Sequence, residues 1–299
     1  MTASLTVQTI LVMFLWAMCF PLIYWGLPYA PHLTFAALRA FLAGVVLLVP
    51  ALMMNCSFPT GLRTWMMLGA IGLGATTLGF LGMFHAAEFV SPGIATVIAN
   101  TQPLMAAGLA AIVLKERLNR RGKAGLFLGF LGVLFIALPT LFSETGTDDR
   151  YVRGVVYIIL AALGITVSNV LIRYQAGRMD ALHAMGWQLV LGGVFLAIPA
   201  LATEDVGTVM WERPFVLSLL GLAVPGTALA YWLWCRILEQ AELNHANAFS
   251  FLVPVFGLSL GQVFFQEKIG AMVAAGIVMT VLGIVLVNGN DKNRQNITG

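Results

Sequence analysis

The chain has 299 residues, of which 60% are hydrophobic and only 10% are charged, and its mean hydropathy is +0.90. A water-soluble domain of this length needs far more polar surface, so the composition predicts a polytopic membrane protein. The formal net charge is +3, but the basic residues lie in short links and form no aromatic-interleaved patch, which argues against nucleic-acid binding. The three cysteines are widely spaced and indicate neither a disulfide framework nor a metal site.

Ten apolar stretches are long enough to cross a bilayer as helices of about twenty residues. In chain order they cover Val7–Gly26, His32–Met54, Leu62–Ala86, Pro92–Leu114, Gly122–Pro139, Gly154–Tyr174, Ala181–Ala202, Phe215–Leu238, Ala246–Phe265 and Ile269–Asn288. The links between them are short, so neighbouring helices are expected to be antiparallel. The sequence therefore predicts an all-α integral membrane protein with ten transmembrane helices, without a catalytic site, cofactor or metal.

The second half of the chain repeats the first. Adding 151 to a residue number carries Thr76 to Thr227 and Pro103 to Pro254. Because each half has five spans, an odd number, the second half should lie upside down relative to the first, as an inverted repeat. We expect residues 1–142 to form the first five-helix repeat, 143–153 a linker, 154–290 the second, inverted repeat and 291–299 a polar tail.

The basic residues predict the orientation. With a cytoplasmic N-terminus, eleven of the sixteen Lys and Arg residues fall on the cytoplasmic side, so both termini are expected there. Arg39 lies inside the second span, where a charge is costly unless it snorkels to the interface or finds a partner. A structural role is the favoured interpretation, and Gln188 holds a similar place in the seventh span.

Two further patterns concern packing. Glycines recur in the fifth and tenth spans, at Gly125, Gly132, Gly276 and Gly283 among others, and predict close helix contact within a monomer or in a dimer. Glu116 ends the fourth span, where we expect it to cap the next helix or to pair with a neighbour such as Arg120.

Polar and aromatic residues recur at helical spacing on one face of several spans, and we expect these faces to line a central cavity. A proline removes a backbone hydrogen bond, so the fourth and ninth spans should break at Pro103 and Pro254. The candidate substrate-binding residues are Trp16, Phe20, Thr76, Phe80, Met83, Asn100, Asn169, Thr227, Tyr231, Trp234, Asn247 and Phe251. The alternatives are that the aromatic residues contact lipid and that the amides form hydrogen bonds between helices.

These features together resemble the drug/metabolite transporter superfamily, specifically its EamA-repeat exporters. The resemblance rests on the two five-span halves, on Trp16–Ala17 with Phe20, on Arg39, and on a proline thirteen residues before a glutamate in each half. The chain looks most like the YddG-type exporters of aromatic and other amino acids. The resemblance implies a multi-pass carrier of the bacterial inner membrane, monomeric or weakly dimeric. Such a carrier transports small molecules by alternating access around a central cavity.

The favoured function is the export of amino acids, including aromatic and other neutral ones. Broken helices offer free N–H groups to a carboxylate and free carbonyls to an ammonium group. The alternative is the export of drugs or other small metabolites by the same kind of protein. A cationic-drug exporter should carry an acid within the membrane, whereas all thirteen acids lie in links or at span ends. A sugar-phosphate carrier should carry mid-membrane Lys or Arg, and Arg39 is the single candidate. A purely structural or receptor role is the third alternative.

Overall fold

The computed structural model describes residues 1–85, 92–141, 149–265 and 270–289, and these ranges contain helices and no strands. The first half comprises α1 (Ala3–Gly26), η1 (Leu27–Tyr29), α2 (His32–Met53), α3 (Leu62–Ile71), η2 (Gly72–Leu78), α4 (Gly79–His85), α5 (Pro92–Ala99), α6 (Gln102–Val113) and α7 (Arg120–Leu141). The second comprises α8 (Asp149–Gln175), α9 (Ala181–Thr203), η4 (Val206–Thr208), α10 (Arg213–Ala223), η5 (Val224–Leu229), α11 (Ala230–Gln240), α12 (Leu243–Asn247), η6 (Ala248–Phe251), α13 (Leu252–Phe265) and α14 (Ala271–Asn288).

Ten helical stretches within the described residues are long and apolar enough to cross a membrane. The predicted all-α, multi-pass architecture is therefore confirmed. Large apolar side chains also remain exposed on the outer helix faces, among them Val45, Leu52, Ile112, Phe127 and Leu282. Lipid contact accounts for this exposure, since a water-soluble protein rarely leaves so much apolar surface uncovered. Helix α8 begins at Asp149, inside the range 143–153 that was assigned to a linker, and the rest of that assignment lies outside the described residues or stays a prediction.

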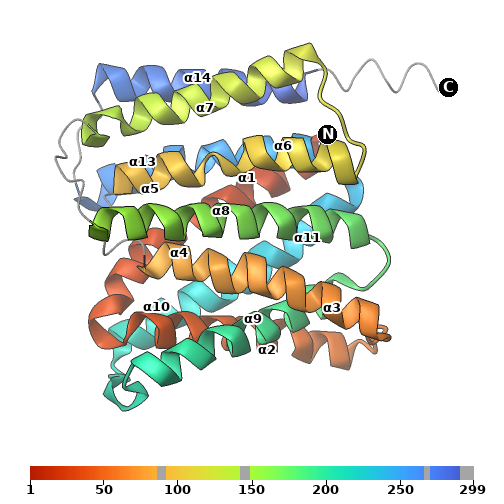
Figure 1. The fold of residues 1–299 in the computed structure, drawn as a ribbon, viewed down its shortest axis with the longest axis vertical. Coiled ribbons are helices and arrows are strands. Elements are labelled where there is room, and N and C mark those ends of the chain that lie inside the picture. Colours follow the sequence, from red (N-terminus) through yellow and green to blue (C-terminus); the bar gives the residue numbers. More distant parts are fainter. Residues whose placement is uncertain (86–91, 142–148, 266–269, 290–299) are drawn as a thin grey trace.

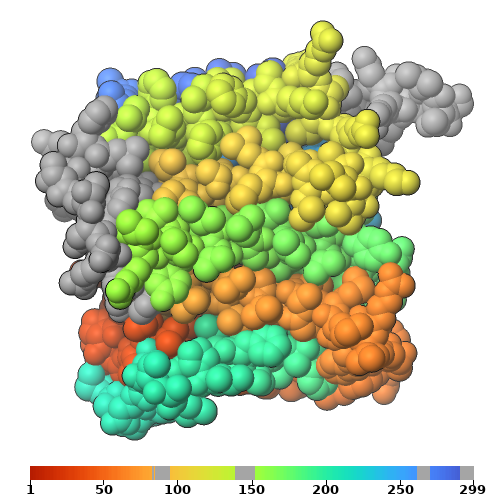
Figure 2. All heavy atoms as spheres, in the orientation of Figure 1, coloured from red at the N-terminus to blue at the C-terminus, as the bar shows by residue number. Residues whose placement is uncertain are grey.

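The helices lie in layers, nearly parallel to one another (Figure 1). One outer layer is the pair α7 and α14, and the outer layer on the opposite side is formed by α2, α9 and α10. Figure 2 shows α8, in green, lying between α3 and α4, in orange, and α5 and α6, in yellow. The first helix of the second half is thus flanked on two sides by helices of the first half.

The glycine rows of α7 and α14 pack against each other within one chain. A Cβ atom at Gly132 would lie 2.6 Å from the Gly276 carbonyl oxygen, and one at Gly283 would lie 2.6 Å from the Gly125 carbonyl oxygen. No side chain fits at these distances, so the two helix backbones are in direct contact. Of the two predicted uses of the glycines, the structure shows packing inside the monomer.

The third and eighth spans each contain a widened segment that the sequence analysis did not predict. Residues Gly72–Leu78 (η2) and Val224–Leu229 (η5) are wound as π-helix, and the 151 shift carries residues 72–78 to 223–229. In each segment a threonine hydroxyl bonds the carbonyl oxygen five residues earlier: Thr77 to Gly72 at 3.2 Å, and Thr227 to Leu222 at 2.7 Å. A π-turn inside an α-helix often marks a functional position.

The fourth and ninth spans are interrupted beside their prolines. In the fourth, α5 ends at Ala99 and α6 begins at Gln102, one residue before Pro103. In the ninth, η6 separates α12 from α13, and Pro254 is the third residue of α13. Each proline therefore lies in the first turn of a new helix, where its missing N–H leaves no intrahelical hydrogen bond unmade.

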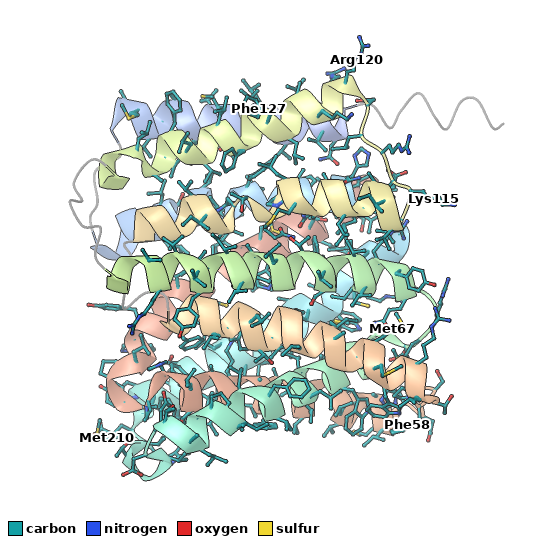
Figure 3. All side chains as sticks on the ribbon, in the orientation of Figure 1. Phe58, Met67, Lys115, Arg120, Phe127 and Met210 are labelled. Atoms are coloured by element: carbon teal, nitrogen blue, oxygen red, sulfur yellow. The ribbon has the colours of Figure 1, made fainter. Side chains whose placement is uncertain are left out.

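The chain begins and α14 ends at the same end of the bundle (Figure 1). Lys115 and Arg120 lie at that end as well, whereas Met210 lies at the opposite one (Figure 3). The positive links and the N-terminus thus share one side of the protein, which is the arrangement that the charge pattern predicts. That this side is cytoplasmic stays a prediction.

Candidate functional site

Three helices bring two tryptophans, a tyrosine and an asparagine together. The ring centroid of Trp16 in α1 lies 5.4 Å from that of Trp234 and 6.1 Å from that of Tyr231, both in α11. The indole N–H of Trp234 donates a hydrogen bond of 3.0 Å to Oδ1 of Asn169 in α8. These four residues are called the aromatic cluster below. All four were candidates in the sequence, and they join helices of both halves.

The aromatic cluster is anchored to the first π-segment. The hydroxyl of Tyr231 donates to the Ala75 carbonyl oxygen at 3.1 Å, and Ala75 lies in η2. Trp234 and Asn169 are buried, whereas Trp16 and Tyr231 are half-buried. The cluster therefore offers apolar ring surface together with an amide, a combination suited to a small molecule with an apolar part and a polar part.

A pair of hydrogen bonds links the second helix of each half to the π-segment of the other half. Arg39 in α2 donates from Nε to Oγ1 of Thr227 in η5 at 2.8 Å. In the other half, Oγ1 of Thr76 in η2 donates to Oε1 of Gln188 in α9 at 2.8 Å. All four side chains are buried. Thr76 and Thr227, both predicted site residues, are thus used in corresponding bonds across the junction of the halves.

The surroundings of Arg39 are mostly neutral. Its Nη2 lies 3.3 Å from Sγ of Cys19, and its guanidinium carbon lies 4.2 Å above the ring centroid of Phe80. The remaining nitrogen, Nη1, is buried without a hydrogen-bond partner. The side chain does not reach the interface, as the snorkelling interpretation required, but turns into the protein because the hydroxyl of Thr227 and the Phe80 ring bind it there. Phe80, a predicted site residue, thus makes a cation–π contact with this charge.

The amides at the helix breaks differ in their use. Nδ2 of Asn100 donates to the Thr96 carbonyl oxygen at 2.8 Å and so binds the last turn of the preceding helix α5. Nδ2 of Asn247 is buried and has no partner. Near this second break, Phe251 packs against α7, since a Cβ at Gly129 would lie 2.6 Å from its ring. Neither Asn100 nor Phe251 belongs to the aromatic cluster.

One other predicted residue, Phe20, lies apart from the cluster. The side chain of Phe20 is 51% exposed in α1. The side chain of Met83 lies outside the described residues, as does that of Glu267. Within the part of the chain that the structure describes, no group of three or more His, Cys, Asp or Glu side chains is placed to hold a metal ion.

One link between the halves was missed. Glu116, after the end of α6, binds Nε of Arg173 in α8 through Oε1 at 2.8 Å and accepts the backbone N–H of Leu243 through Oε2 at 2.8 Å. Arg173 also donates to the Leu238 carbonyl oxygen at 2.7 Å. The expected partner Arg120 is not the one used. A capping role was foreseen, but the capped helix, α12, belongs to the other half and not to the next span.

Arg39 and Gln188 were not predicted as the partners of the candidate threonines Thr227 and Thr76. Both were noted for their matching places in the second and seventh spans, but neither was included among the site residues. Their similar places in the two spans were the signal in the sequence. In the structure each of them binds one of the two threonines that the 151 shift relates. Only the crossing of the halves reveals which threonine each one meets.

Comparison with known proteins decides the family. The model of the EamA-like transporter family matches the chain twice, over residues 4–138 and 152–289. The chain belongs to the EamA-like transporter family. It is therefore a transporter, and the expected membership of the drug/metabolite transporter superfamily is confirmed.

Several relatives carry transporter names. A WAT1-related chloroplast protein of Arabidopsis thaliana is 27% identical over 91% of this chain and 69% of its own length. The uncharacterized transporter YvbV of Bacillus subtilis is 25% identical over 94% and 90%. The probable amino-acid metabolite efflux pump of Salmonella typhimurium is 27% identical over 93% and 92%. A solved crystal structure, 18% identical, superposes with a TM-score of 0.83 over the whole of both chains and supports the fold.

Proposed function

We propose that this EamA-family transporter exports amino acids, with a broad range that includes aromatic and other large neutral ones. The aromatic cluster supports the proposal most directly, because it joins ring surface and an amide where helices of the two halves meet. The name of the Salmonella typhimurium relative is consistent with the same substrate class. We further propose a monomeric or weakly dimeric carrier in a bacterial inner membrane, with both termini cytoplasmic.

The mechanism we propose is alternating access, with the second half inverted relative to the first. The corresponding π-segments, broken helices and crosswise threonine bonds are what two inverted copies would place around a shared site. Rocking one half against the other would separate Trp16 from Tyr231 and Trp234 and admit the apolar part of the substrate between them. An aromatic contact of this kind contributes about 0.5–1.5 kcal/mol.

Uptake into proteoliposomes tests the proposal. Labelled phenylalanine, leucine and alanine are compared with a drug cation and a sugar phosphate. We expect uptake of the amino acids, and we expect Trp234→Ala to weaken phenylalanine uptake several-fold more than alanine uptake. Trp65→Ala is the matched control, since Trp65 makes a comparable edge contact with Trp187 at 5.1 Å, outside the cluster.

The outcomes separate the candidate functions. Transport of the drug cation without the amino acids would favour the export of drugs or other small metabolites. Absence of transport for the whole panel, with folded protein, would contradict the proposal and favour a receptor role. An equal loss for phenylalanine and alanine in Trp234→Ala would mean that the cluster does not hold the apolar part of the substrate.

A further inference from the structure

We propose that Arg39 binds the carboxylate of the substrate and thereby selects carboxylates over amides and amines. The proposal rests on the proposed transport of small molecules through the aromatic cluster, and it assigns the anionic end of the substrate to one residue. It replaces the expectation that the free N–H groups of the broken helices bind the carboxylate.

Arg39 lacks a counter-charge among the described residues. Arg39 is 2% exposed, and its contacts are a hydroxyl, a thiol and an aromatic ring. Among the described residues no carboxylate lies within ion-pair distance of it, and Glu116 and Glu204 are held by other groups. The two N–H bonds of Nη1 therefore have no acceptor.

A buried charge without a counter-charge destabilises the protein. A guanidinium cannot be neutralised by losing its proton within a protein. An unpaired buried charge costs several kcal/mol even after relaxation. Charges inside membrane spans are accordingly rare and usually belong to substrate or ion pathways. An anion that arrives from outside would supply both the missing charge and the missing acceptors.

The second half of the chain makes a similar bond without a charge. Gln188 holds a similar place in the seventh span, 149 positions after Arg39, and accepts a hydrogen bond from the hydroxyl of Thr76. A neutral amide is thus sufficient to tie the second helix of one half to the π-segment of the other. The positive charge of Arg39 is not needed for that structural bond and calls for another explanation.

The residues that contact Arg39 lie on the same helices as the aromatic cluster. Cys19, which contacts Arg39, lies three residues after Trp16 in α1, and Thr227 lies four residues before Tyr231. On two independent helices, therefore, a residue that contacts Arg39 lies about one helical turn, a rise of about 5.4 Å, from a member of the aromatic cluster. That separation suits an amino acid whose side chain lies on the rings and whose carboxylate lies at the guanidinium. The structure is closed around Arg39, so the anion reaches it when the halves move apart.

Binding to the purified protein tests the proposal without requiring transport. Isothermal titration compares phenylalanine, phenylalaninamide and 3-phenylpropionate, which keep the ring but differ in carboxylate and ammonium. In the unmodified protein we expect phenylalanine to bind at least tenfold more tightly than its amide, and 3-phenylpropionate to bind measurably. In Arg39→Gln the two carboxylates should weaken at least tenfold while the amide is unchanged. Gln188→Met, which removes the corresponding bond of the other half, should keep the preference for carboxylates.

A structural role for Arg39 would give a different result. Arg39→Gln would then lower the Tm and weaken all three compounds alike, and this outcome would overturn the proposal. Should Arg39→Gln fail to fold, Arg39→Lys keeps the charge without the planar fork, and the preference should fall several-fold but persist. An unchanged preference in Arg39→Gln would also overturn it. If carboxylates bind through Arg39 but no amino acid is transported, the proposed function fails and this inference stands.

Discussion

The link formed by Glu116 should hold one end of the two halves together, and its removal can be tested directly. Glu116→Gln keeps the shape of the side chain but removes its charge and leaves one acceptor oxygen in place of two. Either Arg173 Nε or the Leu243 N–H then loses its partner. A hydrogen bond to a charged group contributes about 1.5–3 kcal/mol when buried. Because the Arg173 side chain is 26% exposed, solvent screening reduces this contribution to about 1–2 kcal/mol.

Hydrogen exchange measures this free energy. A weakening of about 1–2 kcal/mol raises the population of locally open molecules roughly 5- to 30-fold. Backbone amides of residues 238–247, which include the capped Leu243, should exchange faster by that factor in Glu116→Gln. The same variant should change the rate of transport, since the link joins α6 to α8 and α12 and must break if this end opens.

The matched control lies on α11. Arg236 and Glu239 form an ion pair of the same 2.8 Å length, but they are three residues apart on one helix, and the Arg236 side chain is 50% exposed. Glu239→Gln should therefore leave exchange at residues 238–247 nearly unchanged. Equal acceleration in both variants, or none in Glu116→Gln, would refute the interpretation of Glu116 as a link between the halves.

Three further outcomes are expected. Gly283→Ala should destabilise the protein by about 1–3 kcal/mol, because its Cβ would lie 2.5 Å from the Gly129 nitrogen. Gly108→Ala, with nothing within 4 Å, should not lower the Tm in detergent, and equal shifts would contradict the packing argument. Trp234→Phe should cost about 1–3 kcal/mol by leaving Oδ1 of Asn169 unpaired, and Asn169→Leu in the same chain should recover part of it in a double-mutant cycle. Transport should need only the substrate gradient, and uphill accumulation driven by a pH gradient in liposomes would contradict this.

Part of the candidate site was predictable because it depends on local patterns. Trp16, Asn169, Tyr231 and Trp234 were identified from helical spacing on inward faces, and the structure brings them together. Others were identified by the same rule but lie elsewhere. Phe20 shares the first span with Trp16 yet is largely exposed. A helical stripe is broad, and spacing alone does not say which of its edges meets another helix.

The sequence by itself determined the ten spans and the 151-residue repeat, because hydropathy and proline positions act within a single helix. The tertiary structure decided which residues of the two halves form hydrogen bonds with each other. Arg39 meets Thr227, 188 positions away, and Glu116 meets Leu243, 127 positions away. Such bonds form only where helices of the two halves cross, and the π-segments that carry Thr76 and Thr227 widen at those crossings. For that reason only the tertiary structure shows that Arg39, whose sequence position also suits a side chain reaching the membrane interface, is buried between the two halves.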